Sequence, residues 1–257
     1  MANICQIQWL GQMEYEAITE LQHQLVVKRI AQEIPNMLLL LKHPHTYSVG
    51  LGSRKELLLT NPAELDRLNI AYYEADRSGS VMYHGPGQLA AYPILSLREI
   101  GHNYHSYIEA LESIIIRALR AFKIHAFRQR GERGVWVLRD RASHYGFHRD
   151  ERDEPVAQIG IIGTRVNKND ITSYGFYINV NPDIDYFNLI MPHGLPACKV
   201  TSLERIMNRS VKIGDVIQPV IQSFCEFFGF DPLVMDLNLP PVMNEAILAQ
   251  ASDAIRS

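Results

Sequence analysis

Hydrophobic positions along the chain follow two spacings, one typical of helices and one typical of buried strands. Residues 103–122 and about 214–228 carry apolar side chains at every third or fourth position, which predicts two amphipathic helices. Asn103 is suited to cap the first helix, and Pro219 fits the second only near its first turn. The side chains predicted to face the core are Tyr104, Tyr107, Ile108, Leu111, Ile114, Ile115, Ala118 and Phe122 in the first helix, and Val216, Ile217, Val220, Ile221, Phe224 and Phe228 in the second.

Shorter apolar runs alternate with these helices. Residues 15–30 show a further helical pattern, whereas 4–9, 37–41 and 88–95 are short and mostly apolar, as expected of strands. The alternation predicts an α+β fold in which helices cover a mixed sheet. We expect one domain over residues 1–230 and a tail, 231–257, that ends in a helix packed on the domain or on a partner.

Composition and charge narrow the class of protein. Of the 257 residues, 47% are hydrophobic and 21% charged, as in ordinary globular chains, and the net charge of −3 argues against nucleic acid as a partner. The three cysteines have no metal-ligand spacing and suggest reduced thiols in a cytoplasmic protein. We expect no signal peptide, and no apolar run approaches the 18 residues typical of a membrane span.

The stretch Arg77-Ser78-Gly79-Ser80-Val81-Met82-Tyr83-His84-Gly85-Pro86-Gly87-Gln88 has the composition of a shaped polar loop. Its glycines allow tight turns or the close approach of a ligand, and Pro86 fixes one φ angle. A loop that carries a base, a cation and free backbone N–H groups on a core strand is a candidate site. The alternative is a tight turn between strands that happens to contain a histidine.

This stretch resembles the loop of the lipoyl(octanoyl) transferase family, whose pattern is Arg-Gly-Gly-x-x-Thr-(Tyr/Phe)-His-Gly-Pro-Gly-Gln. Ser78 stands at the second position of the pattern, where the family has glycine, and Met82 stands in place of the threonine. Five further segments resemble the family in the same order along the chain: a strand and turn at 43–50, a central strand at 134–137, and the segments 159–166, 175–180 and 190–203.

The resemblance implies a fold of the biotin and lipoate protein ligase catalytic-domain type, with no cofactor and no metal. It implies transfer of an octanoyl or lipoyl group from acyl carrier protein to a lysine of a lipoyl-bearing domain, such as the glycine cleavage H protein or the E2 subunit of a 2-oxoacid dehydrogenase. It places an acyl tunnel between the 77–88 and 190–203 loops. The substrate-binding residues that it implies are Arg77, Ser78, Gly79, Ser80, Val81, Met82, Tyr83, His84, Ile161, Ile162, Gly163, Gly175, Phe176 and Tyr177.

The two catalytic positions of the family are substituted here. The family uses a cysteine in a Pro-Cys-Gly turn and a lysine at the start of a Lys-Ile-Ala-Ala-Ile-Gly strand, and this chain has His193 and Gln158 at those positions. The histidine of the family's His-Gly-Phe-Ala turn is replaced by Tyr174. The catalytic candidates are therefore His193, Gln158, His84 and Cys198.

Three outcomes follow from these substitutions. In the first, His193 accepts the acyl group, because imidazole is a nucleophile at neutral pH. Alternatively, Cys198 is the nucleophile, since the adjacent Lys199 favours its thiolate. In the third case neither residue reacts, and the protein binds lipoyl domains or acyl carrier protein as a scaffold. His193 and His84 together are also suited to polarise a thioester for direct attack by a lysine.

Two further features bear on function. Residues 139–155 are densely charged with both signs and look like an insertion in the family pattern, which favours an exposed hairpin or loop. His144 and His148 lie there four positions apart, but no matching cluster predicts a metal site. An ATP-dependent lipoate ligase is a third functional reading, although such enzymes carry a Gly-Gly-Gly run that residues 77–79 lack.

Overall fold

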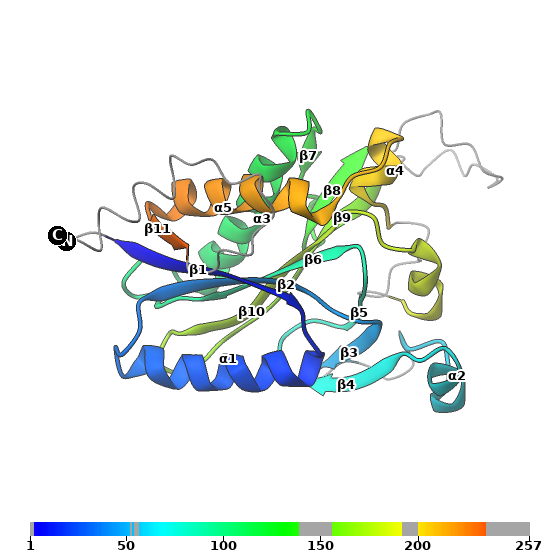
Figure 1. Ribbon diagram of the computed structural model, residues 1–257, viewed down its shortest axis with the longest axis horizontal. Coiled ribbons are helices and arrows are strands. Elements are labelled where there is room, and N and C mark those ends of the chain that lie inside the picture. Colours follow the sequence, from blue (N-terminus) through cyan, green and yellow to red (C-terminus); the bar gives the residue numbers. More distant parts are fainter. Residues whose placement is uncertain (1–2, 52, 54–56, 139–155, 192–199, 235–257) are drawn as a thin grey trace.

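The core of the protein is a mixed sheet of eight strands, seen edge-on in Figure 1. The computed structural model describes residues 3–51, 53, 57–138, 156–191 and 200–234. Most neighbouring strands run antiparallel, whereas β11, β1 and β2 run parallel. In spatial order the strands are β11 (Asp231–Val234), β1 (Ile4–Gln12), β2 (Asn36–Lys42), β6 (Gln88–Ile94), β10 (Thr172–Asn179), β9 (Val156–Val166), β8 (Val135–Leu138) and β7 (Ala126–Phe127).

A layer of helices covers one face of this sheet. Helices α3 (Tyr104–Arg120) and α5 (Ile213–Phe228) pack against each other and against the sheet (Figure 1). Their apolar stripes join one hydrophobic core, which includes Leu111 of α3, Phe224 of α5 and Phe176 of β10. This face of the sheet is therefore closed by aliphatic and aromatic side chains.

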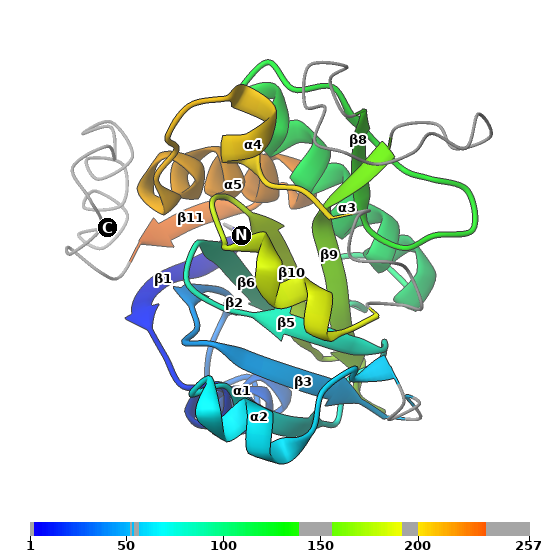
Figure 2. The same cartoon turned by 90° about the vertical axis from the view of Figure 1, so that its right-hand side faces the viewer.

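The other face of the sheet carries two different elements. Helix α1 (Tyr15–Ile30) packs on β6 and β10. Beside it lies a sheet of three strands, in the order β4 (Ala71–Ala75), β3 (Thr46–Gly50) and β5 (Val81–His84) (Figure 2). The short elements are α2 (Pro62–Arg67), the 3₁₀ helix η2 (Ile184–Leu189) and α4 (Leu203–Met207). A second hydrophobic core fills this side.

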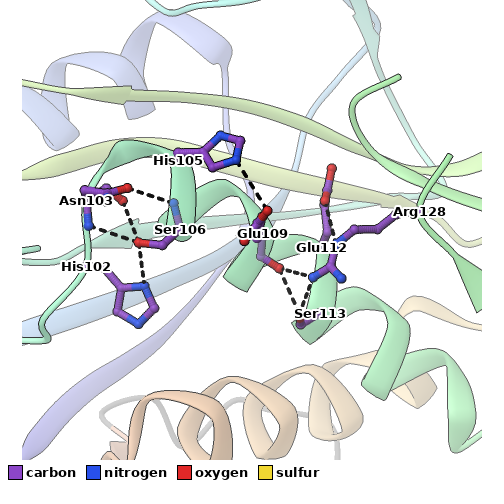
Figure 3. Close-up of polar contacts among 8 residues, drawn as sticks. All are labelled: His102, Asn103, His105, Ser106, Glu109, Glu112, Ser113 and Arg128. Carbon is purple, nitrogen blue, oxygen red and sulfur yellow. Dashed lines mark hydrogen bonds and ion pairs between the residues drawn. The ribbon is translucent and has the colours of Figure 1, made fainter. Parts of the chain in front are cut away.

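The predicted helices are confirmed, with two differences of detail. Asn103 caps α3 because its side-chain oxygen accepts a hydrogen bond from the Ser106 N–H, and the Asn103 N–H in turn donates to the Ser106 hydroxyl (Figure 3). Tyr104 was expected in the core, but it stands at the first turn of α3 and is 36% exposed. Pro219 lies inside α5 rather than near its first turn, because the buried stripe on both sides of it holds the helix together.

Three strand predictions needed correction. Residues 81–84 form strand β5 and are not part of a loop, because they pair with β3 and are buried. Strand β8, which matches the expected central strand, lies next to the edge strand β7. The first four residues of the expected tail form β11, which pairs with β1, and the rest of the tail and the expected insertion lie outside the described residues. Within the described part of the chain, no helix is long and apolar enough to cross a membrane.

Candidate active site

Strand β5 presents alternate side chains to two different neighbours. Met82 and His84 face the large sheet, where the thioether of Met82 covers Gly163 of β9 and the His84 ring lies 4.5 Å from the Tyr177 ring of β10. Tyr83 points the other way, and its ring stacks on Tyr186 at a centroid distance of 5.3 Å. A strand at this place explains the alternation, since successive side chains point to opposite faces.

Arg77 fixes the turn that leads into β5. Its side chain is fully buried, and the guanidinium donates to the carbonyl oxygens of Ser48, Ser78 and Ser80, to the Ser48 hydroxyl and to the Tyr15 hydroxyl. These acceptors use all five guanidinium N–H groups. The structure therefore shows Arg77 as a brace for the 77–80 turn.

Ser48 is the hydrogen-bond partner of His84. Its Oγ accepts from Arg77 and lies 2.6 Å from His84 Nε2, and because a hydroxyl can accept twice, this contact fits either tautomer of the ring. When the Ser48 hydroxyl donates to Nε2, the proton of the neutral ring sits on Nδ1. Nδ1 is buried and has no partner in hydrogen-bonding geometry, and the Gln88 side chain is near enough to raise the pKa of His84.

The surroundings of His84 keep the ring neutral. Burial is the main cause that lowers the His84 pKa well below its usual value, and the nearby His43 and Arg77 lower it further. Tyr15 stacks on the same ring at a centroid distance of 5.0 Å. His84 is therefore a buried, neutral ring whose Nδ1 has no hydrogen-bond partner.

A second buried chain of hydrogen bonds lies beside His84 and was missed at the sequence level. His43 Nδ1 donates to the Met13 carbonyl, so Nε2 accepts from the Tyr92 hydroxyl at 2.6 Å, and Tyr92 accepts from Tyr177 at 3.0 Å. Burial lowers the His43 pKa to about 4. His43 is the first residue of the 43–50 segment that resembles the family. This resemblance was the only sign in the sequence that His43 belongs to the site.

Tyr174, which replaces the family histidine, links strand β10 to Asp76, the residue that precedes the 77–80 turn. Its hydroxyl donates to Asp76 at 2.6 Å, and Asp76 also forms an ion pair with Arg165. Tyr174 has a φ of +53°, which is strained for an aromatic residue. Its backbone N–H donates to the buried Gln22 side chain at 2.6 Å, which holds this conformation.

Gln158, at the family's lysine position, is directed toward β8. Its carboxamide donates to the Arg133 carbonyl at 2.9 Å and lies against Gly134, where a side chain would collide with it. Glu112 of α3 accepts from the Gly134 N–H and from Arg128, which holds the 128–134 segment on the helix (the Glu112–Arg128 contact is drawn in Figure 3). In this arrangement the Gln158 side chain holds β9 against the 128–134 segment.

The flanks of the predicted nucleophile loop lie on two sides of the site. Met191 donates its N–H to the Leu57 carbonyl, and Val200 forms a bridge with Gln158. Asn179 of β10 accepts from Gln88 at 2.9 Å and donates to the Thr201 carbonyl at 3.1 Å. Residues 192–199, with His193 and Cys198, lie outside the described residues.

Several predicted substrate-binding residues lie away from this group. Ile162 and Phe176 belong to the core under α3 and α5, because neighbouring residues of a strand face opposite sides. Val81 and Tyr83 lie on the face of β5 opposite Met82 and His84. The Gln88 N–H, one of the backbone N–H groups of the 77–88 stretch, already donates to the Gly85 carbonyl.

The remaining predicted positions fall close to the His84 group. Ile161 and Gly175 lie on β9 and β10 with Gly163 and Tyr177 as neighbours, and Ser78 donates to the Thr164 carbonyl at 2.7 Å. Gly79 has a φ of +97° and Ser80 accepts from Arg77, so both shape the turn. Among the described residues, no group of three potential metal ligands occurs.

Comparison with known proteins agrees with the resemblance found in the sequence. Residues 14–225 match the family described as lipoyl protein ligase A/B catalytic domain. An octanoyltransferase of Chloroflexus aurantiacus is 35% identical over 228 residues, covering 89% of this chain and 96% of the relative. An octanoyltransferase of Rubrobacter xylanophilus is 36% identical over 223 residues, covering 86% and 92%.

Solved structures confirm the predicted fold. A bipartite lipoate protein ligase structure from Thermoplasma acidophilum superposes with a TM-score of 0.66 at 14% identity, over 97% of this chain and 92% of that chain. A lipoate-protein ligase A bound with ATP gives a TM-score of 0.63 at 12% identity, over 98% and 95%. This chain belongs to the lipoyl protein ligase A/B catalytic domain family.

Proposed function

We propose that this protein is an acyltransferase that moves an octanoyl group from acyl carrier protein to a lysine of a lipoyl-bearing domain. The observation that carries the proposal is the buried, unpartnered Nδ1 of His84, beside the Arg77–Ser48 pair in a chain 35% identical to an octanoyltransferase over most of its length. When Nδ1 carries the ring proton, it is a donor suited to a reaction in which negative charge develops on a carbonyl oxygen.

His84 acts in this proposal by donating Nδ1–H to the carbonyl oxygen of the octanoyl thioester. In this proposal Nε2 of the neutral ring accepts from Ser48, so the Nδ1–H donor is oriented before the substrate binds. A fixed donor in a site without water stabilises the oxyanion more strongly than a solvated one does. Arg77 and Ser48 position this ring without touching the substrate.

The nucleophile in the proposed reaction is His193 or Cys198. The nucleophilic nitrogen or sulfur forms a bond to the thioester carbon, the carbon–sulfur bond to acyl carrier protein breaks, and the thiol of the carrier leaves with a proton. The lysine amine of the acceptor then attacks the acyl-enzyme, releases the nucleophile and keeps the octanoyl group as an amide. An acyl-imidazole on His193 requires that water be excluded, because it hydrolyses readily.

Capture of the acyl group tests which residue reacts. After incubation with octanoyl-acyl carrier protein, the intact mass of the protein should increase by one octanoyl group. The adduct should disappear in His193→Ala if histidine is the nucleophile and in Cys198→Ala if the thiol is. An adduct that survives in both single variants contradicts both assignments.

A double substitution tests whether the rest of the site is suited to this chemistry. His193→Cys with Gln158→Lys restores the residues of the family pattern, and it should raise transfer above wild type, because an ammonium next to a thiol lowers the thiol pKa. Each single change should do less, since a thiol with a pKa near 8.5 is only a few per cent ionised at pH 7. A folded double variant without acyl-enzyme or transfer contradicts the acyltransferase proposal.

The proposed partners are octanoyl-acyl carrier protein and a lipoyl domain of the glycine cleavage H protein or of a 2-oxoacid dehydrogenase E2 subunit. The proposed location is the cytoplasm, which the free thiols of Cys5 and Cys225 support. One observation favours a second function: both catalytic positions of the family are replaced, by His193 and Gln158. A protein that binds octanoyl-acyl carrier protein without forming an adduct or transferring the group would fit a binding role.

A further inference from the structure

The thioether of Met82 occupies a place that exists only because residue 163 is glycine. Met82 is 1% exposed and lies on the face of β5 that meets β9. A Cβ atom added at Gly163 would be 2.9 Å from both Sδ and Cε of Met82, closer than such atoms can approach. The bare backbone of Gly163 and the end of the Met82 side chain therefore fill one space between the two sheets.

The polar side chains around Met82 are fixed by hydrogen bonds, whereas the Met82 side chain is held by packing alone. Arg77 uses all its N–H groups, His84 is bonded to Ser48 and stacked on Tyr15, and Tyr177 donates to Tyr92. Methionine is unbranched, adaptable and without a polar group that needs a partner. Exchanging Met82 therefore changes the space beside Gly163 and breaks none of these hydrogen bonds.

We propose that Met82 sets the length of the acyl chain that this protein accepts. The inference rests on the proposed function and adds to it a residue that determines specificity. Met82 and His84 are two positions apart on one face of β5, so their Cα atoms are about 7 Å apart. An acyl chain whose carbonyl accepts from His84 Nδ1–H and which runs along β5 toward Gly163 ends against the Met82 thioether.

The sequence supports a difference from the family at this position. The family pattern has threonine where this chain has Met82, while Gly163 matches the glycine of the family's strand. Threonine is shorter by most of the thioether arm and leaves the face of Gly163 uncovered. This protein should therefore accept octanoyl and shorter chains and reject longer ones.

Direct binding of fatty acids tests the inference without requiring catalysis. Titration calorimetry with hexanoate, octanoate, decanoate and dodecanoate should show wild-type affinity that stops rising beyond octanoate. In Met82→Thr the preference for decanoate over octanoate should rise by at least about tenfold, since decanoate has two more methylenes and each contributes roughly a factor of four when buried. Met82→Val, which has the branched shape of threonine and is apolar like methionine, is the substitute if the threonine variant does not fold.

Two matched variants separate a local effect from a general loosening of the core. Met37→Thr makes the same exchange at another buried methionine of the same hydrophobic core, and it should leave the chain-length profile unchanged. Gly163→Ala added to Met82→Thr places a methyl group in the opened space, so it should reverse the gain for decanoate.

Transfer assays with acyl carrier protein that carries acyl chains of the same lengths distinguish the role of Met82 from the proposed transferase function. A tenfold shift in binding without any transfer supports the role of Met82 and contradicts the transferase. Octanoyl transfer with the same chain-length profile in wild type and Met82→Thr overturns the role of Met82 and leaves the transferase intact. Failure of wild type and both Met82 variants to bind any of the acids also overturns it.

Discussion

The two faces of strand β9 are specified by different kinds of interaction. On one face, Ile162 joins the core under α3 and α5, and Ile115 of α3 reaches Gly160. On the other face, Gly163 receives Met82 of β5 beside the hydrogen-bonded group of Arg77 and His84. Apolar volume closes the first face, whereas directed hydrogen bonds hold the second. The comparison predicts that substitutions on the first face act through lost apolar volume, and that substitutions on the second act through lost hydrogen bonds.

The largest expected effect comes from the helix-facing side. Phe176→Ala removes a fully buried ring and should lower the free energy of unfolding by about 4 kcal/mol, because a cavity is left between β10 and the helices. Urea denaturation measures the change. Val27→Ala on the exposed surface of α1 is the control and should stay within about 0.5 kcal/mol of wild type. A loss below about 1 kcal/mol for Phe176→Ala contradicts this account of the helix face.

On the site-facing side, Arg77→Met tests whether hydrogen bonds hold the turn. The carbonyl oxygens of Ser48, Ser78 and Ser80 lose their donor, and the expected loss is about 3–4 kcal/mol. Arg77→Lys should recover little of it, since a lysine cannot reproduce the planar fork of donors. Urea denaturation of the two variants decides the point: full recovery by lysine shows that charge alone is needed.

Acid should weaken the site-facing side selectively. The folded protein keeps His43 neutral down to a pKa of about 4, whereas the unfolded chain binds a proton below pH 6.5. Protons therefore favour the unfolded state, and stability that is complete above pH 6.5 should fall by about 3 kcal/mol as the pH approaches 4. His84, whose pKa is also lowered, adds to the same slope.

A variant isolates the contribution of His43 to this slope. In His43→Gln, the dependence of the unfolding free energy on pH between 4 and 6.5 should be flatter than in wild type. Chemical denaturation at a series of pH values measures it. Identical slopes in both proteins show that His43 titrates normally in the folded state.

The smallest effect is expected from the bond that sets the His84 tautomer. Ser48→Ala removes the donor to Nε2 and should cost about 1 kcal/mol. The ¹⁵N chemical shifts of His84 in wild type should show a proton on Nδ1 and none on Nε2, and the variant should show a mixture. A wild-type ring protonated on Nε2 contradicts the tautomer and the donor role.

Much of the helix-facing side was predictable from the sequence. The spacing of Ile108, Leu111 and Ile115 predicted α3, and its cap at Asn103 follows from residue type alone. Tyr104 was the exception, because a stripe at helical spacing does not show where the covering layer ends. Its hydroxyl instead reaches Ser78 at 3.0 Å on the outside of the site.

The site-facing side was predictable only in part. The sequence located Arg77, Met82 and His84 in one stretch, but not that β5 is a strand that turns Tyr83 away from them. It also placed Ile162 and Phe176 in the site, since which face a strand residue occupies depends on register and pairing. The register shift between β8 and β9 near Val135, and the left-handed Tyr174, have no signature in one sequence.

The central claim is that this site transfers an octanoyl group although the family's cysteine and lysine are replaced. The most direct measurement is the intact mass of a lipoyl domain after incubation with this protein and octanoyl-acyl carrier protein. The account predicts a gain of one octanoyl group on the domain, which is lost when its acceptor lysine is replaced. An unmodified domain, under conditions in which the Chloroflexus aurantiacus octanoyltransferase modifies it fully, would contradict the claim.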